Sequence, residues 1–254
     1  MTRLAAFLLL CCAAAAVAEA PPEQLRVQVV AAYPHDPQAF TQGLVLHGTS
    51  LYESTGLVGR SSLREVELRT GRVLREADLK PPLFGEGLAW AKGELVQLTW
   101  QNGEALRWNP ASFAPIGTHR YAGEGWGLCF DGTHLVQSDG SQRLYFRDPS
   151  TFALVRTMAV HEGGRPLDRL NELECVGDTI YANVWTTERI VAITARNGTV
   201  RAAIDASSLL TREERASLAS GAVLNGIAYD ARDGTFLVTG KLWPKLFRVR
   251  FVPR

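Results

Sequence analysis

The sequence predicts an all-β protein with the fold of a five-bladed β-propeller, in which each blade has four strands. Three observations support this fold class. Five segments of similar pattern recur along the chain, each is followed by further strand-like segments, and the last repeat lacks a strand while the N-terminus has a surplus one. A β-sandwich with regular turns is the alternative, but it does not explain the missing and surplus strands.

Each recurring segment is a short apolar strand that follows a small or polar residue and ends in a Gly or Asp turn. The five segments lie at residues 40–48, 84–90, 124–132, 170–178 and 224–230. Successive copies are 44, 40, 46 and 53 residues apart when they are aligned on Gly43, Gly87, Gly127, Leu173 and Gly226. This spacing is close to the period of roughly 40–45 residues that is typical of propeller blades.

The remaining strands of each repeat follow in a constant order. A second strand is expected at residues 50–54, 94–100, 134–139, 179–185 and 235–239, and a third begins near Leu63, Leu106, Leu144, Ile190 and Leu246. In the first four repeats a turn then precedes a fourth strand. These turns, rich in Gly, Asn, Asp and Pro, lie at residues 69–72, 109–112, 148–151 and 196–199.

The N-terminal strand is expected to complete the last blade. The fifth repeat ends at Arg254, right after its third strand, whereas residues 25–32 form a surplus strand. A strand moved from the end to the beginning of a circular array closes the array and removes its open edge. Between the fourth and fifth repeats, Thr211 and Glu214 form a capping box that predicts one short helical insertion.

The first twenty residues are typical of an export signal. Arg3 supplies a positive charge, residues 4–17 are apolar and uncharged, and Ala18-Glu19-Ala20 offers a cleavage point. The apolar run is short for a transmembrane helix, so a cleaved signal is favoured over an uncleaved anchor. We therefore expect a signal peptide at residues 1–20, a single five-bladed propeller domain at residues 21–254, and an exported protein that is periplasmic or secreted.

The net charge bears on the kinds of partner that the protein is expected to bind. The formal net charge of +1 gives no electrostatic reason to expect binding to nucleic acid or to an anionic membrane, and we expect a monomer.

Cys129 and Cys175 are the cysteines outside the export signal, and they occupy matching strand positions in neighbouring repeats. We expect two free thiols in the core, although export permits a disulfide.

Propeller topology brings particular side chains together at one end of the axis. In a four-stranded meander the chain enters the first strand and leaves the second on the same face. The flanking residues are Phe40, Gln42, Phe84, Glu86, Trp126, Asn171, Glu172 and Asn225 at the first strands, and Glu53, Trp100, Asp139, Trp185 and Lys241 after the second strands. Aromatic walls with a few polar groups are typical of a pocket for a small molecule or a peptide end. A carboxylate among aromatic rings is expected to have a raised pKa, which suits acid–base chemistry.

Each of these residues also has a structural interpretation. The tryptophans can pack in the core or at the rim, Glu86 can accept backbone hydrogen bonds, and Lys241 can be a solvated charge. Glu172, Glu174 and Asp139 are expected to be structural. The five histidines lack paired ligand spacing, so no metal site is predicted, although the pattern leaves open a structural cation in the central channel.

Eight ordered motifs lie between residues 33 and 248. They occupy residues 33–44, 53–62, 84–88, 123–128, 171–174, 182–185, 224–229 and 238–244. Together they closely resemble the plant-type glutaminyl cyclases, a family found in plants and bacteria. One motif alone would be weak, whereas eight in order are specific.

The resemblance implies a five-bladed propeller, which the repeats predict independently. It also implies conversion of the N-terminal glutamine of peptides or proteins to pyroglutamate with release of ammonia. By motif, Glu86 is similar to the catalytic acid–base of the family. The substrate pocket of the family corresponds here to Phe40, Gln42, Phe84, Trp100, Trp126, Asn171, Trp185 and Lys241. The family is not thought to use a catalytic zinc, so no cofactor is expected.

Two other functions are compatible with an aromatic mouth. One is a non-catalytic propeller that binds a peptide or a glycan there. The other is a metal-dependent, lactonase-like hydrolase, which would need a cluster of Asp, Asn and Glu ligands at the axis.

Overall fold

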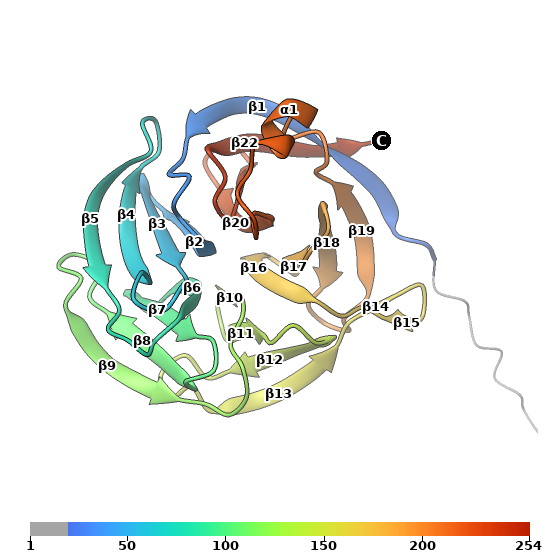
Figure 1. Ribbon diagram of the computed structural model, residues 1–254. Coiled ribbons are helices and arrows are strands. Elements are labelled where there is room, and N and C mark those ends of the chain that lie inside the picture. Colours follow the sequence, from blue (N-terminus) through green and yellow to red (C-terminus); the bar gives the residue numbers. More distant parts are fainter. Residues whose placement is uncertain (1–19) are drawn as a thin grey trace, which may run out of the picture.

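The computed structural model describes residues 20–254 and is almost entirely β-stranded. The export signal predicted at residues 1–20 lies, except for Ala20, outside the described residues. Figure 1 shows the strands as sheets that follow one another around a central axis in the order of the sequence.

The strands form five four-stranded sets, which we number as blades 1 to 5. Blade 1 contains β2 (Thr41–His47), β3 (Ser50–Thr55), β4 (Ser62–Glu67) and β5 (Arg72–Asp78). Blade 2 contains β6 (Gly85–Ala91), β7 (Glu94–Thr99), β8 (Glu104–Trp108) and β9 (Pro115–Arg120). Blade 3 contains β10 (Leu128–Phe130), β11 (Leu135–Ser138), β12 (Arg143–Arg147) and β13 (Leu154–Ala159). Blade 4 contains β16 (Leu170–Val176), β17 (Thr179–Val184), β18 (Arg189–Thr194) and β19 (Val200–Asp205). Blade 5 contains β20 (Leu224–Asp230), β21 (Thr235–Gly240), β22 (Lys245–Pro253) and β1 (Glu23–Pro34).

Buried apolar side chains gather in five clusters, and each cluster lies between two neighbouring blades. Each cluster contains buried residues from both of its blades. Examples, taken in order around the ring, are Tyr52 with Leu88, Leu98 with Leu128, Leu144 with Ile180, Ile204 with Val238, and Leu237 with Leu44. Since the last cluster joins blade 5 to blade 1, the ring is closed. The described strands therefore have the all-β, propeller-like arrangement of four-stranded sets that the sequence predicts.

The N-terminal strand β1 completes blade 5, as predicted. It pairs antiparallel with β22 from Leu25 opposite Pro253 to Pro34 opposite Lys245. Its first residues also pair in parallel with β19 of blade 4, which the sequence did not predict. This second pairing joins blades 4 and 5 into one eight-stranded sheet and covers an edge that blade 4 would otherwise expose.

The innermost strands approach one another so closely that a side chain does not fit between them. A Cβ atom on Gly43 would lie 2.4 Å from the backbone nitrogen of Leu88, and one on Gly87 would lie 2.4 Å from the backbone nitrogen of Leu128. Glycine is therefore required at these two points of contact between blades.

A buried carboxyl group on β16 joins three blades at the axis. Oε1 of Glu172 accepts a hydrogen bond from the backbone N–H of Leu44 (3.2 Å), and Oε2 accepts one from Ile227 (2.8 Å). Burial raises the pKa of Glu172 well above its usual value, and the neighbouring Glu174 adds to this, against the effect of the two N–H donors. Glu172 thus has the structural place that was expected for it.

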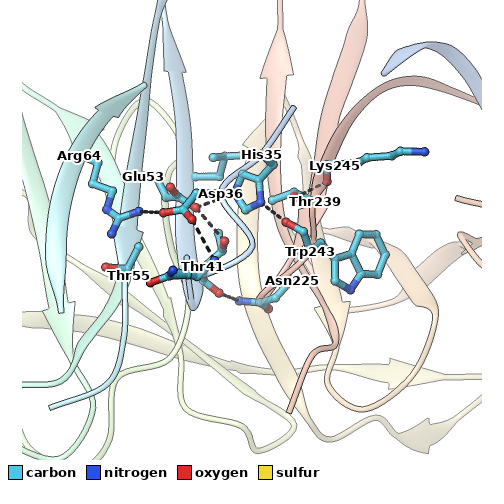
Figure 2. Close-up of polar contacts among 12 residues, drawn as sticks. His35, Asp36, Thr41, Glu53, Thr55, Arg64, Asn225, Thr239, Trp243 and Lys245 are labelled. Atoms are coloured by element: carbon cyan, nitrogen blue, oxygen red, sulfur yellow. Dashed lines mark hydrogen bonds and ion pairs between the residues drawn. The ribbon is translucent and has the colours of Figure 1, made fainter. Parts of the chain in front are cut away.

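A second buried polar cluster ties the end of β1 to blades 1 and 5 (Figure 2). One ring nitrogen of His35 lies 2.6 Å from the carbonyl oxygen of Trp243, and the other lies 2.9 Å from Oε1 of Glu53. Thr41 also donates to that oxygen (2.7 Å). Burial alone would raise the pKa of Glu53, but His35 and Thr41 outweigh it and hold that pKa below its usual value. The cluster therefore fixes the loop that leads from β1 into blade 1.

Of two further elements, a short helix was predicted and a small hairpin was not. The helical insertion is present as α1 (Arg212–Ala216), with the predicted capping box between Thr211 and Glu214. A small hairpin of β14 (His161–Glu162) and β15 (Arg165–Pro166) was not predicted.

The expectation of free thiols is wrong, because Cys129 and Cys175 form a disulfide. The two cysteines lie on β10 and β16, the innermost strands of blades 3 and 4, with their Cα atoms 5.5 Å apart. The two cysteines occupy matching positions on adjacent innermost strands, so their side chains face each other. The sequence pattern of the repeats predicted the matching positions but not the contact between the side chains.

Removal of the disulfide is expected to destabilise the fold without abolishing it. The bond closes a loop between residues 46 positions apart, and disulfides of this kind typically contribute about 2–4 kcal/mol. Denaturant titration of the double variant Cys129→Ala/Cys175→Ala should show this loss. Addition of a reductant should destabilise the wild type but leave the double variant unchanged; equal stability of the two proteins would contradict the prediction.

Substitution of Glu172 by leucine is expected to cost more than the same substitution at Glu174. Glu172→Leu leaves two buried N–H groups without an acceptor, at about 1–3 kcal/mol each. Glu174→Leu is the matched control on the same strand, because that carboxyl accepts one backbone hydrogen bond, from Tyr229 (2.8 Å). Unfolding free energies measured at one pH should therefore fall further for Glu172→Leu, and the reverse order would contradict this role.

Candidate active site

A cavity of about 440 Å³ opens at the end of the axis where the first strands begin and the second strands end. Its lining includes nine of the thirteen residues expected at the mouth, the same nine to which the family resemblance assigns the site: Phe40, Gln42, Phe84, Glu86, Trp100, Trp126, Asn171, Trp185 and Lys241. Four lining residues were not selected, namely Leu57, Thr186, Gly221 and Val223. The predicted convergence of side chains at one mouth is thus observed for these nine residues, whereas Glu53, Glu172, Asn225 and Asp139 do not line the cavity.

Irregular pairing at the start of the first strands aims the polar side chains into the cavity. The pairing register shifts across Gln42 in β2, across Glu86 in β6, and across Asn171 in β16. Such bulges leave the extra residue outside the ladder and change the direction of its side chain. Each polar group is therefore presented by a fixed irregularity in an otherwise regular blade.

The residues on the opposite side of the mouth follow the second strands directly. Trp100 follows β7, Trp185 follows β17, and Lys241 follows β21. The turn after Trp185 is held in an unusual conformation, because Thr186 has a left-handed backbone with φ of 65°. A β-branched residue is rarely found in this conformation, so the sequence pattern did not predict that this turn lines the cavity.

Glu86 is the buried carboxyl group of the cavity. Its side chain is 5% exposed, and Oε1 accepts a hydrogen bond from the side-chain amide of Gln42 at 3.0 Å. Burial raises the pKa of Glu86 well above its usual value; Lys241 opposes this rise and Glu124 adds to it. A carboxyl group whose pKa is raised in this way is suited to acid–base chemistry.

The amide of Gln42 is itself oriented by a neighbour. The amide nitrogen of Asn225 donates to the carbonyl oxygen of Thr41 at 2.9 Å (Figure 2) and lies 3.5 Å from Oε1 of Gln42. This arrangement turns the Gln42 amide nitrogen towards Glu86. Asn171 differs, because its Oδ1 is buried and lacks a hydrogen-bond partner among residues 20–254. That oxygen is available to a donor on a ligand.

Lys241 is a buried cation beside the carboxyl group. Its Nζ lies 4.8 Å from the centre of the Phe40 ring, and the side chain is 5% exposed. Burial lowers the pKa of Lys241 to about 8, although the charge of Glu86 opposes this shift. Lys241 and Glu86 therefore both titrate away from their usual ranges within one cavity.

Aromatic rings form the walls in edge-to-face contacts. The ring centres of Phe40 and Phe84 are 6.2 Å apart, and those of Phe84 and Trp100 are 5.6 Å apart. On the other side, the rings of Trp126 and Trp185 are 5.3 Å apart. Trp100 and Trp185 are each 37% exposed, so they form the rim through which a ligand would enter.

Three carboxylates that the topology placed near the mouth do not line the cavity. Glu53 is bonded to His35 and Thr41, and Glu172 accepts the two backbone hydrogen bonds described above. Asp139 accepts hydrogen bonds from the side chains of Ser141 and Tyr145. Their own partners hold them in the blades, in keeping with the structural role expected for Glu172 and Asp139.

Two further findings concern metal ions and membranes. Among residues 20–254, no group of three or more His, Cys, Asp and Glu side chains is placed to hold a metal ion. In the same part of the chain, no helix is both long and apolar enough to cross a membrane.

Comparison with known proteins agrees with the geometry. The family model described as glutamine cyclotransferase matches residues 3–251. The chain is 40% identical over 230 residues to the glutaminyl-peptide cyclotransferase of Arabidopsis thaliana, which covers 88% of this chain and 71% of the relative. The crystal structure of Myxococcus xanthus glutaminyl cyclase superposes with a TM-score of 0.86 at 41% identity, over 92% of this chain and 99% of that one. The chain therefore belongs to the glutamine cyclotransferase family.

Proposed function

We propose that this protein is a glutaminyl-peptide cyclotransferase in which Glu86 is the catalytic acid–base. It converts the N-terminal glutamine of peptides and proteins to pyroglutamate and releases ammonia. The observation that supports these assignments is a lone buried carboxyl group with a raised pKa, set among aromatic rings, in a member of this family.

The reaction forms one bond and breaks one bond within the same residue. The α-amino nitrogen of the substrate attacks its own γ-carbonyl carbon, and the bond from that carbon to the side-chain amide nitrogen then breaks. A proton leaves the attacking nitrogen and a proton joins the departing one, so the products are the lactam and ammonia. Neither an oxidant nor a second substrate is needed.

Glu86 moves these protons in the proposed mechanism. Its carboxylate takes a proton from the attacking nitrogen, and the resulting carboxylic acid gives a proton to the leaving nitrogen. A group is most effective in such a transfer when its pKa lies near the working pH, and burial shifts the pKa of Glu86 in that direction.

Polar neighbours stabilise the charge that develops on the γ-carbonyl oxygen. The Lys241 ammonium group and the amide nitrogens of Gln42 and Asn171 are the donors that line the cavity. The unpartnered Oδ1 of Asn171 accepts a hydrogen bond from the substrate, for which the α-amino group is a suitable donor. Fixed donors in a poorly solvated cavity stabilise such an oxyanion strongly.

The aromatic walls hold the substrate folded. Ring closure requires the α-amino nitrogen to lie against the γ-carbonyl carbon, and orientation of this kind can lower a barrier by several kcal/mol. Phe40, Phe84, Trp100, Trp126 and Trp185 enclose the cavity and exclude water from it.

We further propose that residues 21–254 form one catalytic domain that acts as an exported monomer, periplasmic or secreted. The signal-like composition of residues 1–20 supports export, and so does the disulfide, because such bonds persist in oxidising compartments. The net charge of +1 provides no field that would attract nucleic acid or an anionic membrane.

Incubation with a glutaminyl dipeptide is expected to release ammonia, and Glu86→Gln is expected to lose this activity. Acid–base catalysis typically contributes about a hundred- to ten-thousand-fold in rate, so kcat should fall within that range. The variant should fold normally, because the new amide oxygen can still accept the hydrogen bond from Gln42. Ammonia release and the melting temperature are the measurements.

The same assay separates the competing functions. Ammonia release that persists with a chelator supports the cyclase, whereas loss with a chelator indicates a metal-dependent enzyme. Absence of ammonia indicates a binding protein. Near-normal turnover by Glu86→Gln would show that Glu86 is not the acid–base.

The acid limb of the pH profile is expected to move to higher pH in Lys241→Met. The cation favours the carboxylate form of Glu86, so its removal raises the pKa of Glu86 further and the base form appears only at higher pH. The loss of an oxyanion donor should also lower kcat by at least about a hundredfold. Lys241→Arg keeps the charge and should keep the limb near its wild-type position; a limb that moves to lower pH in Lys241→Met would contradict the assignment.

A further inference from the structure

The aromatic wall of the cavity has two halves, and both are hydrogen-bonded to one residue that does not itself line the cavity. Phe84 and Trp100 belong to one half, and Trp126 and Trp185 belong to the other. The indole N–H groups of Trp100 and Trp126 both donate to the same oxygen, Oε2 of Glu124, at 2.8 Å and 3.0 Å. Glu124 therefore joins the two halves.

Glu124 is itself held from several directions. Gln101 donates to its other carboxylate oxygen, Oε1, at 2.9 Å, and Gln137 donates to its backbone carbonyl at 2.9 Å. The next residue, Gly125, donates its backbone N–H to the carbonyl of Trp100 at 2.9 Å. A Cβ on Gly125 would overlap the hydroxyl of Tyr121, so this close approach requires glycine. The carboxylate is thus fixed before any substrate arrives.

Glu124 is negatively charged under ordinary conditions. Partial burial would raise its pKa, but the hydrogen bonds from Trp126, Gln101 and Trp100 outweigh burial and hold the pKa below its usual value. The ionisable groups that face Glu86 are Lys241, Glu124 and the phenol of Tyr121, and that phenol stays neutral because burial raises its pKa. Glu124 is therefore the fixed negative charge near Glu86.

We propose that Glu124 is a positioning residue for the cyclisation: it holds the indoles of Trp100 and Trp126 in the orientation that folds the substrate. Its negative charge also adds to the rise in the pKa of Glu86. This inference rests on the proposed function of the cavity. An indole whose N–H is bonded to a fixed carboxylate cannot turn over in place, so the ring face presented to the substrate is constant. Fixed walls are what an intramolecular ring closure needs.

Two substitutions separate the geometry from the charge. Glu124→Gln keeps one oxygen that can accept both indole N–H groups but removes the charge. We expect KM to stay within about twofold of the wild type and the acid limb of kcat to move to lower pH, opposite to the shift expected for Lys241→Met. Glu124→Ala removes the acceptor, and the loss of two hydrogen bonds should raise KM by at least about tenfold.

A double-variant cycle tests whether Glu124 affects KM through its hydrogen bond to the indole of Trp126. Trp126→Phe removes the N–H but keeps an aromatic ring. This substitution should raise KM when Glu124 is present and have little further effect in the Glu124→Ala background. Glu104→Gln is the matched control, since Glu104 is a carboxylate of blade 2 that pairs with Arg120. This control should leave KM, kcat and the pH profile unchanged.

The outcomes are distinguishable. Wild-type KM, kcat and pH profile in Glu124→Ala would overturn the inference, and so would additive effects of Trp126→Phe and Glu124→Ala. If the wild type releases no ammonia, the proposed function fails instead. Substrate affinity, measured by tryptophan fluorescence in the non-turning Glu86→Gln background with and without Glu124→Ala, then still tests whether Glu124 holds the walls. Near-ultraviolet circular dichroism and melting temperatures of all variants identify any that do not fold.

Discussion

Crowding of the innermost strands at the axis is the constraint on which the rest of the structure depends. Glycines such as Gly43 and Gly87 are needed where one blade touches the next, and the pairing becomes irregular at the same points. Those irregularities turn Gln42, Glu86 and Asn171 out of the sheets and into one cavity. The geometry that closes the ring therefore also forms the site.

The two buried carboxyl groups near the axis have different surroundings, which suit one to a structural role and the other to acid–base chemistry. Both Glu172 and Glu86 have pKa values raised by burial. Glu172 accepts backbone hydrogen bonds on both oxygens from other blades, so it is committed to holding strands together. Glu86 accepts one hydrogen bond from the side-chain amide of Gln42 and lines the cavity, so its carboxyl group is within reach of a bound ligand.

Sequence predicted the ring and the lining because both depend on where strands begin and end. A repeat of four strands, with one displaced to the N-terminus, was enough to place Glu86, Trp100 and Lys241 at one mouth. Contacts between side chains of different repeats were not predictable in this way. The Cys129–Cys175 bond requires the spacing between two innermost strands, and the role of Glu124 requires the directions of two indole N–H groups.

The double pairing of β1 has a consequence for folding of the chain. In the finished ring, β22 lies between β1 and β21, so it is inserted between two strands that precede it in the sequence. Until then, β1 has its short parallel contact with β19 as a partner, and β21 has an open edge. Without β22, the facing edges of β1 and β21 stay unpaired, and open edges of this kind favour association with other chains. Pairing with β22 removes both edges.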